Sequence, residues 1–551
     1  MAQRGWVGWL ADNKAASAGI AVSLVIALIG VGVVAARSGN GKKKGTSLQA
    51  GAEGATTTTA VGQVAPLGGT VTSVPGGQTG ASTGAAVPKG TKVAGTTTGG
   101  ATTTGGSTAT TPGGCTPQDD KETGITRSDV RVGQIVSDVS QLPAQLKPNY
   151  EGLQAYVHMV NAQGGVCGRK IVIDYNNDQS NPATHHYSLM IHKDFAFVAN
   201  SSLIDSTDYQ SDAPFNPTLK DNGEFVPDIG GLAYSYGRNQ SPLFAGTVGS
   251  LSPSLTGGGM FRTMVNEAKT VPHGPCRNAG VVYLVEPTGA SEDQGKLGQA
   301  ALLQPWGANF GASHVKLYQA SLAEPLTVYE QTVAQMIADG VNCVFTYSDL
   351  GSDINLVKAM ENRGVWPPDK CTGPTCFALT YVPFAAYDPK FIRDAGDASH
   401  SVLTFIPHVP VNETGSPAMQ TYLKWLKTVP GAEVSTFSLI GWTSGEMFVE
   451  AMNACGGAPT RACVIDYWHK KQGYTAGGLL GAITPFKSTR VDCSGGCGNF
   501  AGKGVYNFKW IFTCSVMLRV ENRNGKVDFY RHTPATGYSC DTLQVARGKP
   551  A

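Results

Sequence analysis

Residues 149–174 constrain the fold most, because they predict a helix, a glycine stop and a buried strand in close succession. Apolar side chains recur at i, i+3, i+4 and i+7, which places one apolar stripe along a helix. Gly164 and Gly165 end that helix, because glycine adopts the left-handed cap conformation without steric cost. The β-branched run 171–173 then predicts a short buried strand, so the segment indicates an α/β unit. The stripe consists of Leu153, Tyr156, Val157 and Val160.

Short apolar runs alternate with helical patterns from about residue 125 onward. Such alternation is typical of parallel sheets covered by helices. Two halves of this kind fit between residues 125 and 544, which is consistent with two lobes hinged around a cleft. No fixed repeat of about 20 to 50 residues, as in a solenoid, is visible. The apolar runs are 130–136, 171–175, 195–198, 281–285, 314–318 and 343–347.

Residues 160–171, with the sequence VNAQGGVCGRKI, carry a resemblance to a known family. They resemble, almost residue for residue, the VNAQGGVNGRKI segment of the type I solute-binding proteins, whose best-known members bind leucine, isoleucine and valine. Further stretches are similar to that family in the same order along the chain. They are an opening strand at 125–133, a strand before a serine-bearing ligand loop at 194–202, the first strand of the second lobe at 279–285, and a DPKF and AGDA region at 388–398.

The resemblance implies an α/β clamshell of two lobes, each a mostly parallel sheet flanked by helices. The lobes of that family exchange segments, which implies crossings near Ala245, near Thr404 and after about Cys463. We therefore expect seven parts in this chain. They are a short tail at 1–14, a transmembrane anchor at 15–36, a disordered linker at 37–123, the first part of lobe 1 at 124–245, the main part of lobe 2 at 246–404, returning helices of lobe 1 at 405–463, and a C-terminal segment completing the lobes at 464–551.

Residues 15–36 contain no charged side chain and are largely apolar. A helix of that length rises roughly 33 Å, enough to cross the hydrocarbon core of a bilayer. A transmembrane anchor is the favoured interpretation. A cleavable signal peptide stays open as the alternative, because Val-Ala-Ala at 34–36 weakly resembles a cleavage site. No cysteine precedes Cys115, so lipid attachment just after the apolar segment is not available.

Residues 37–123 are rich in threonine, glycine and alanine and contain almost no large apolar side chain. Such a segment cannot bury enough surface to offset the entropy of ordering it, which predicts a disordered linker. About 80 flexible residues span roughly 50 Å on average, so the folded part can stand off from a membrane. The formal net charge of +2 gives no reason to expect nucleic acid as a partner.

Ligands of doubly wound sheets gather beyond the carboxyl ends of the strands. Ser201 and Ser202 are the best candidates, because small hydroxyls can bind a polar ligand group without filling the cleft; a helix cap is the alternative. Tyr347 and Tyr381 are candidates for the cleft wall, with core packing as the alternative. Trp442 either caps the pocket or anchors a helix, and the helix is favoured. The ligand-binding candidates are Ser140, Asn200, Ser201, Ser202, Gly231, Leu232, Glu286, Tyr347, Ser348, Asp349 and Tyr381.

Two departures from the family pattern bear on the ligand. Amino-acid binders of that family place a hydroxyl residue in the loop matching 230–232, and an acidic residue for the ammonium in the loop matching 381–384. This chain has neither. An ammonium group without a carboxylate partner is costly in a closed cleft, so an ordinary branched-chain amino acid is not expected. Asp349 is the candidate for a replacement charge, and residues 203–225 have the character of an insertion beside the ligand loop.

Twelve cysteines lie beyond the apolar segment, several at short spacings that indicate disulfides. Cys276 and Cys343 precede the first and third strands of the second lobe, which are neighbours in a sheet of order 2-1-3, so they are expected to pair. Cys371 with Cys376, and Cys455 with Cys463, would close short loops. The sequence constrains the other three pairs less: Cys115 with Cys167, Cys493 with Cys497, and Cys514 with Cys540. A metal site is the alternative for Cys493 and Cys497.

The side of the membrane is indicated by two conflicting signals. Arg37 and the lysines at 42–44 follow the apolar segment, and only Arg4 and Lys14 precede it, which favours a cytoplasmic C-terminal side. The cysteines favour an oxidising compartment. We give the cysteines more weight, because large domains translocate regardless of flanking charge. The prediction is a single-pass N-terminal anchor in the cell membrane with the folded domain outside the cytoplasm.

Signs of an enzyme are weak. The glycines at 257–259 lack the Gly-Lys-Ser/Thr ending of a phosphate loop, and no serine has a nucleophile-elbow context. His185, His186 and His192 are expected on an exposed face of an amphipathic helix, with a metal site as the minor alternative. We therefore expect no enzyme, no cofactor and no metal.

The favoured function is a membrane-tethered, extracytoplasmic and bacterial solute-binding protein. Its two lobes would close on a small polar ligand, either amino-acid-like or an amide or organic acid, and present it to an ABC-type permease. The alternative is an anchored sensor or cell-surface interaction protein that uses the same clamshell without transport. An extracytoplasmic enzyme is the third interpretation, and no reactive constellation in the sequence supports it.

Overall fold

The structure of the protein is a computed structural model. The predicted anchor, and nearly all of the predicted linker, lie outside the residues it describes. Among the described residues, no helix is both long and apolar enough to cross a membrane. The described residues are 115–118, 122–139, 146–205, 225–234, 238, 241–247, 267, 269–285, 292, 295–296, 298–299, 302, 314–321, 324–483, 485, 491–492, 508–510, 513–541 and 544–545.

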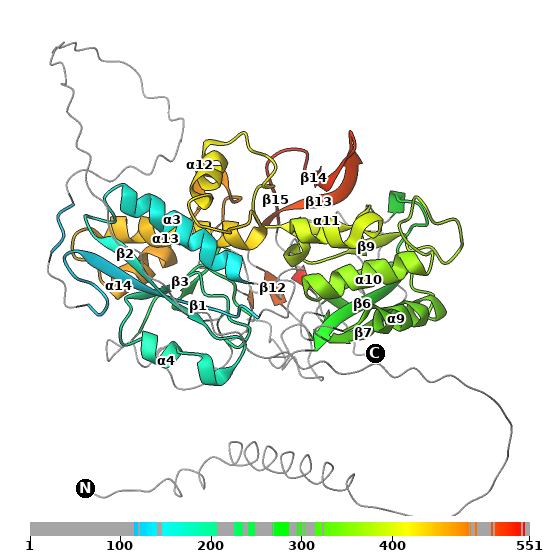
Figure 1. Cartoon of the computed structure of the whole chain (residues 1–551), viewed down its shortest axis with the longest axis horizontal. Helices are drawn as coiled ribbons and strands as arrows, with labels where there is room; N and C mark the ends of the chain where they lie inside the picture. The colour runs from blue at the N-terminus through cyan, green and yellow to red at the C-terminus, as the bar shows by residue number, and fades with distance from the viewer. Residues whose placement is uncertain are drawn as a thin grey trace, which may run out of the picture. The chain divides into compact units, whose positions relative to one another are not determined.

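The first lobe is built on a sheet of five parallel strands in the order β2-β1-β3-β4-β5, and Figure 1 labels β1, β2 and β3. Apolar residues of β1 and β3 alternate between the two faces of this sheet, and each face carries its own buried cluster. The sheet is therefore covered on both sides, as the sequence predicted. Its strands are β1 (Asp129–Val136), β2 (Lys170–Asn177), β3 (Ala196–Val198), β4 (Asp228–Ile229) and β5 (Phe244–Ala245).

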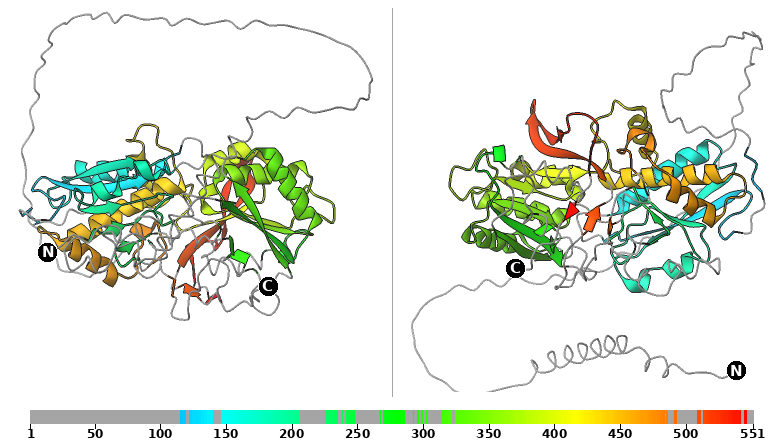
Figure 2. Two further views of the ribbon diagram at one scale, coloured as in Figure 1. Left: turned by 90° about the horizontal axis from the view of Figure 1, so that it is seen from below. Right: turned by 180° about the vertical axis from the view of Figure 1, so that it is seen from behind.

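The predicted helix of the first lobe forms as α3 (Lys147–Ala162), and all four residues of its apolar stripe are buried. It ends as predicted, because Gly165 has a φ of +79° and its N–H donates to the carbonyl of Val160 at 2.9 Å. Helix α13 (Thr436–Cys455) lies alongside α3 (Figures 1 and 2). A Cβ at Gly152 of α3 or at Gly441 of α13 would clash with the other helix's backbone, so glycine permits the close approach.

Three further helices belong to the first lobe. Residues of α12 and α13 contribute to the same buried cluster as α3, although they follow the strands of the second lobe in sequence. Helix α14 contributes Ile465 to the cluster on the opposite face of the sheet. The bounds of these helices are α4 (Tyr187–Met190), α12 (Pro417–Leu426) and α14 (Arg461–Lys470), with a short 3-10 turn at Pro182–Thr184 before α4.

The second lobe contains an eight-stranded sheet that runs β14-β13-β10-β9-β8-β6-β7, with β15 paired to β13. The five strands β10, β9, β8, β6 and β7 are parallel to one another. Strand β13 pairs antiparallel with β10, and β14 pairs antiparallel with β13. The order β7-β6-β8 confirms the predicted 2-1-3 arrangement. The strands are β6 (Asn278–Val285), β7 (His314–Ser321), β8 (Cys343–Tyr347), β9 (Leu379–Tyr381), β10 (Leu403–Ile406), β13 (Thr513–Arg523), β14 (Lys526–Thr533) and β15 (Ser539–Asp541).

Helices pack against the second sheet and bury one continuous cluster with β6, β8, β10, β13 and β14. The hairpin of β13 and β14 extends from the edge of this sheet (Figures 1 and 2). A separate sheet joins β11 (Val491–Asp492), β12 (Phe508–Trp510) and β16 (Gln544–Val545). The helices of the second lobe are α9 (Leu326–Ala338), α10 (Leu350–Asn362) and α11 (Pro389–Ala395), with 3-10 turns at Phe384–Ala386, Gly396–Ser399 and, between α14 and β11, Ala476–Gly478.

The chain alternates between the two sheets along its length. Strand β5 of the first sheet ends at Ala245, and β10 of the second sheet contains Thr404. After β10 the chain contributes α12, α13 and α14 to the first lobe, and β13 then returns to the second sheet. The segments therefore alternate between the lobes, although the exact domain boundaries stay a prediction.

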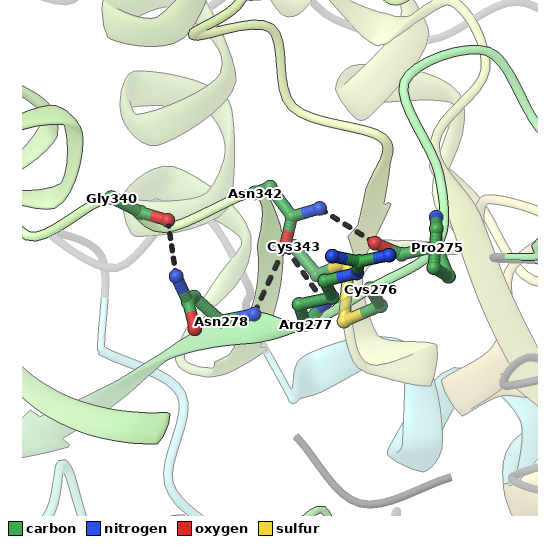
Figure 3. The surroundings of a disulfide bond; sticks show 7 residues. All are labelled: Pro275, Cys276, Arg277, Asn278, Gly340, Asn342 and Cys343. Carbon is green, nitrogen blue, oxygen red and sulfur yellow. Dashed lines mark hydrogen bonds between the residues drawn. A yellow bond between two sulfur atoms is a disulfide. The ribbon is translucent and has the colours of Figure 1, made fainter. Parts of the chain in front are cut away.

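Cys276 and Cys343 form a disulfide at the edge where β6 and β8 begin (Figure 3). Their Cα atoms are 5.5 Å apart, within the range of a bridge between neighbouring strands. The side chain of Asn342 supports this edge, because its Oδ1 accepts from the N–H of Asn278 at 3.1 Å and its Nδ2 donates to Pro275 O at 2.8 Å. The structure also forms four of the other expected pairs, Cys115 with Cys167, Cys371 with Cys376, Cys455 with Cys463 and Cys514 with Cys540, while Cys493 and Cys497 lie outside the described residues.

Residues 115–118, which the sequence assigned to the linker, are held against the first lobe. Besides the disulfide from Cys115 to Cys167, the N–H of Gln118 donates to Gly457 O at 3.0 Å. The buried guanidinium of Arg169 donates to Gln118 O at 2.7 Å. A soluble fragment should therefore begin before Cys115 rather than at residue 124.

Candidate functional site

The loop after β3 is fixed to the end of β1 in the first lobe. Ser201 N–H donates to Ile135 O at 2.8 Å, and Ser137 N–H donates to Ser201 O at 3.1 Å. The side chain of Asn200 accepts from Ile135 N–H at 2.8 Å. These bonds continue the pairing of β1 and β3 beyond the strands. They bring the predicted ligand residues Asn200, Ser201 and Ser202 together at the carboxyl end of the sheet, where the strand rule placed them.

A buried carboxylate, Asp178, lies behind this loop. Its Oδ1 accepts from Ser137 Oγ at 2.6 Å, and its Oδ2 accepts from Ser202 Oγ at 2.5 Å and from His185 Nδ1 at 2.9 Å. The N–H of Ser180 also donates to Oδ1 at 2.9 Å. Burial raises the pKa of Asp178, but the hydrogen bonds from His185, Ser137, Ser202 and Ser180 outweigh it and lower that pKa below its ordinary value. The group is therefore an ionised anchor for the surrounding loops.

The prediction for the histidines is wrong for His185. Helix α4 begins only at Tyr187, so neither His185 nor His186 lies on it. The His185 side chain is nearly buried against Asp178 because a charged carboxylate in the interior requires hydrogen-bond donors. His186 and His192 are exposed. No group of three or more acidic, histidine or cysteine side chains among the described residues has the geometry to hold a metal ion.

The arrangement around Asp178 restricts what the serines can do. Each hydroxyl has one proton, and Ser137 and Ser202 both donate theirs to Asp178. The Ser202 oxygen also accepts from Ile204 N–H at 3.2 Å. Ser202 therefore has no proton to offer a ligand carboxylate. The Ser201 oxygen instead accepts from the Asn149 amide, and the buried Ser201 hydroxyl donates to no other described residue. Because the serines contact Asp178 rather than a histidine, this cluster does not activate a serine nucleophile.

The loop after β4 contributes Gly231 and Leu232. Leu232 N–H donates to Asn200 O at 2.8 Å, which joins the loops after β3 and β4. Gly231 N–H donates to Ser444 Oγ of α13 at 2.9 Å. Gly231 has a φ of +72°, and a Cβ there would clash with the backbone of Asn200. Glycine is therefore needed at this position both for its backbone angle and for the close approach.

The second-lobe candidates lie at the ends of β8 and β9. Tyr381 is buried and packs against Phe405, with ring centroids 5.2 Å apart. Tyr347 is also buried, and burial raises its pKa well above the ordinary value. Their burial fits the packing alternative for both tyrosines, and the Tyr347 hydroxyl has no hydrogen-bond partner among the described residues. Trp442 likewise packs edge-on against Tyr156 at 4.9 Å, which fits its helix-anchoring interpretation.

Asp349 and Ser348 have structural partners at the start of α10. Asp349 is the N-cap of that helix, and its Oδ1 accepts from Gly351 N–H at 2.8 Å. Ser348 donates to Asp353 Oδ1 at 2.6 Å. Burial raises the pKa of Asp353 to about 7, partly opposed by the Ser348 hydrogen bond. Asp349 thus has a capping role that the sequence pattern Asp-Leu-Gly-Ser could have suggested. The remaining candidates, Ser140 and Glu286, lie outside the described residues.

Sequence reasoning missed two buried charges at the site. Asp178 directly follows β2, so the same strand-end rule that selected Asn200 would have selected it. Arg238, which is buried beneath the loops after β3 and β4, has no such signal, because it follows no recognisable strand or motif.

No family model and no curated protein matches the chain. Solved structures do match. The fatty acid ABC transporter substrate-binding protein from Thermomonospora curvata has a TM-score of 0.54 at 14% identity, covering 76% of this chain and 95% of that one. A possible leucine/isoleucine/valine-binding protein from Rhodopirellula baltica SH 1 has a TM-score of 0.52 at 14% identity, covering 74% and 96%. The chain has the type I periplasmic binding protein fold.

A third match is the ABC transporter solute-binding protein from R. palustris in complex with 4-hydroxybenzoate. Its TM-score is 0.50 at 15% identity, with 74% of this chain and 98% of that chain covered. These three structures are of binding proteins rather than enzymes. At these identities the comparison establishes the two-lobed α/β fold, and it confirms the fold that the sequence resemblance implied.

Proposed function

We propose that this chain is a membrane-tethered, extracytoplasmic solute-binding protein that captures a small polar ligand for an ABC-type permease. The observation that carries the proposal is the junction of three loops at the carboxyl ends of β1, β3 and β4, within a two-lobed fold shared with solute-binding proteins. Ligands of doubly wound sheets bind at this edge. Closure of the lobes would be driven by the ligand's higher affinity for the closed state.

The hydrogen bonds favour a ligand group that accepts at Ser201. Its hydroxyl donates to no described residue, whereas the hydroxyl of Ser202 donates to Asp178. The loop at 381–384 has no acidic residue to pair with an ammonium group, which distinguishes this site from that of a standard amino-acid binder. We therefore propose an amide or organic acid, or an amino-acid-like compound bound in a different manner from leucine.

Anchoring and compartment are part of the same proposal. Residues 15–36 are uncharged and long enough to span a bilayer, which supports an N-terminal anchor. The five disulfides among the described residues support an oxidising, extracytoplasmic location for the folded part. Extraction of cell membranes with alkaline carbonate tests the anchor: the chain stays in the pellet if it is anchored, and a variant lacking residues 15–36 is released.

A thermal-shift screen of the full chain in mild detergent tests solute capture. The panel includes amino acids, amides, 4-hydroxybenzoate and other organic acids, sugars and nucleosides. A compound that binds only the folded state raises the unfolding midpoint in a concentration-dependent way. A folded chain that responds to no compound would favour the sensor or interaction function instead.

A pair of serine variants sharpens this screen. Ser201→Ala removes the hydroxyl donor, and the loss of one neutral hydrogen bond should weaken binding of the hit compound by about fivefold. Ser416→Ala is the matched control, because Ser416 caps α12 through Met419 N–H and lies outside the ligand loops. It should lower stability without changing affinity. Equal affinities for all three proteins would show that the Ser201 hydroxyl does not contact the compound.

A further inference from the structure

Arg238 is a buried arginine whose guanidinium contacts both loops of the candidate site. Its side chain is 1% exposed. Nη1 donates to Leu232 O at 2.6 Å and to Asn200 O at 3.2 Å, and Nη2 donates to Gly230 O at 3.3 Å. The three carbonyls belong to the loops that follow β3 and β4. One side chain therefore connects two segments that are about thirty positions apart in the sequence.

Two neighbouring carboxylates balance the positive charge of Arg238. Asp228 of β4 accepts two hydrogen bonds from it, at 2.7 Å from Nε and 2.9 Å from Nη2. Asp205 Oδ2 lies 3.4 Å from Nη1 and also accepts from Tyr234 N–H at 2.9 Å. The guanidinium lies over the ring of Phe244, 4.9 Å from its centroid. These contacts allow the guanidinium only one orientation, because its donors are fixed in a plane.

We propose that Arg238 is the positioning residue that sets the geometry of the loops after β3 and β4, and through them the affinity for solute. The effect of Arg238 on solute affinity rests on the proposed function. Because the peptide unit is planar and trans, a carbonyl held by Arg238 also fixes the direction of the next N–H. The Gly230 carbonyl faces the guanidinium, and the following Gly231 N–H donates to Ser444 Oγ. The side chain thus determines which backbone groups each loop presents.

Lysine cannot replace this arginine. A bidentate pair with Asp228 and three carbonyl contacts need donors spread over a planar fork. An ammonium group presents three donors from a single atom at the end of a flexible chain. Arg238→Lys keeps the positive charge beside Asp228 and Asp205, and should release part of the carbonyl set. The substitution therefore separates the positioning role from simple charge balance.

Arg461 offers a matched control in the same lobe. Arg461 is 4% exposed, and its guanidinium donates to Phe195 O at 3.0 Å, Asp194 O at 2.6 Å and Ile191 O at 3.3 Å. These carbonyls lie before or at the start of β3, at the opposite end of that strand from Asn200. Arg461→Lys is thus a comparable change to a buried, carbonyl-binding arginine away from the ligand loops.

Amide hydrogen exchange of the full chain tests the positioning without any ligand. In Arg238→Lys, peptides covering residues 199–205 and 228–234 should exchange about tenfold faster than in the unmodified chain, and peptides covering 191–197 should not. Arg461→Lys should show the reverse pattern. The same uniform acceleration in both variants would overturn the proposal, because it would mean that Arg238 only contributes to overall stability.

Binding measurements then test the consequence for affinity. 4-Hydroxybenzoate and the compound with the largest thermal shift serve as probes. Arg238→Lys should weaken binding of a probe by about tenfold or more, and Arg461→Lys should change it less than twofold. Equal affinities despite faster loop exchange would overturn the link to binding. If no probe binds the unmodified chain, the solute-binding proposal fails, while the exchange pattern still decides the positioning role.

A milder variant keeps the test decisive if Arg238→Lys does not fold. Asp205→Asn removes one charged neighbour of Arg238 and retains an oxygen that can accept from Tyr234 N–H. It should accelerate exchange at 230–234 and leave 191–197 unchanged. Unchanged exchange at 230–234 in a folded Asp205→Asn variant would contradict the proposed coupling of Arg238 to that loop.

Discussion

We predict that His408 contributes to the protein's stability an amount that is lost in mild acid. It lies just after β10, where the chain leaves the second sheet, and it is 1% exposed. Its Nδ1 is 2.9 Å from Val409 O and its Nε2 is 3.2 Å from Thr436 Oγ1. The neutral imidazole satisfies both, with Nδ1–H donating to the carbonyl and Nε2 accepting from the hydroxyl. Burial lowers the pKa of His408 to about 4, partly opposed by the Val409 carbonyl.

The size of the effect follows from linkage. An unfolded histidine has an ordinary pKa of 6.5. Between pH 6.5 and about 4, the unfolded chain binds a proton at His408 that the folded chain does not, so stability falls as the pH falls through this window. The gap corresponds to about 3 kcal/mol at about 1.4 kcal/mol per pH unit. Below about pH 4 the folded chain also binds the proton and the loss is complete.

The total pH profile is not a clean test, because buried carboxyl groups act in the opposite direction. Burial raises the pKa of Asp194 to about 8, with a further contribution from Asp174, and burial raises the pKa of Glu446 to about 7. The folded chain holds protons there that the unfolded chain has lost. These groups therefore stabilise the fold as the pH falls. Only the difference between the unmodified chain and a His408 variant isolates the histidine.

His408→Gln is the suitable variant, since its amide can still donate to Val409 O and accept from Thr436. Urea unfolding, followed by tryptophan fluorescence, should be measured at pH 7.5, 6, 5 and 4 for both proteins. The free energy of unfolding of the unmodified chain, relative to the variant, should fall by about 3 kcal/mol between pH 7.5 and 4. A difference that stays constant over this range would refute the reasoning.

Further predictions concern a glycine, a disulfide and a helix cap. Gly231→Ala should lower the free energy of unfolding by more than about 2 kcal/mol, because its Cβ would clash with Asn200 and its φ is +72°. Gly431→Ala has a similar φ of +76° but open space around the Cβ, so it should cost only about 1 kcal/mol, and equal losses in urea unfolding would contradict the clash. Replacing both Cys276 and Cys343 by serine should cost roughly 2 to 4 kcal/mol, and reducing agent should then destabilise the variant less than the unmodified chain. Ser435→Ala should cost about 1 kcal/mol by breaking the capping box of α13, and an unchanged unfolding midpoint would argue against that cap.

The elements that the sequence predicted well are those determined by local pattern. The stripe on α3 and the glycines after it depend on neighbouring residues, so periodicity and glycine conformation were enough. The disulfide between Cys276 and Cys343 could be predicted for a different reason. Parallel strands begin at a common edge, so residues preceding adjacent strands meet there once the strand order is known.

The parts that sequence reasoning missed depend on contacts between distant segments. Arg238 acquires its partners only when β3 and β4 become neighbours, and no local pattern marks it. His185 was expected on an exposed helix, but it precedes α4 and contacts the buried carboxylate of Asp178, which lies seven positions before it. Tyr381 was placed correctly at a strand end, yet a strand end does not reveal whether its side chain faces the site or the core.

The central claim is that the two lobes close on one small solute. Amide hydrogen exchange of the full chain, with and without the compound found in the thermal-shift screen, tests this most directly. Peptides containing Ser201 and Leu232 in the first lobe, and Tyr347 and Tyr381 in the second, should all gain protection when the compound is saturating. Protection confined to one lobe, or absent from these four positions while the compound binds elsewhere, would contradict capture between the lobes.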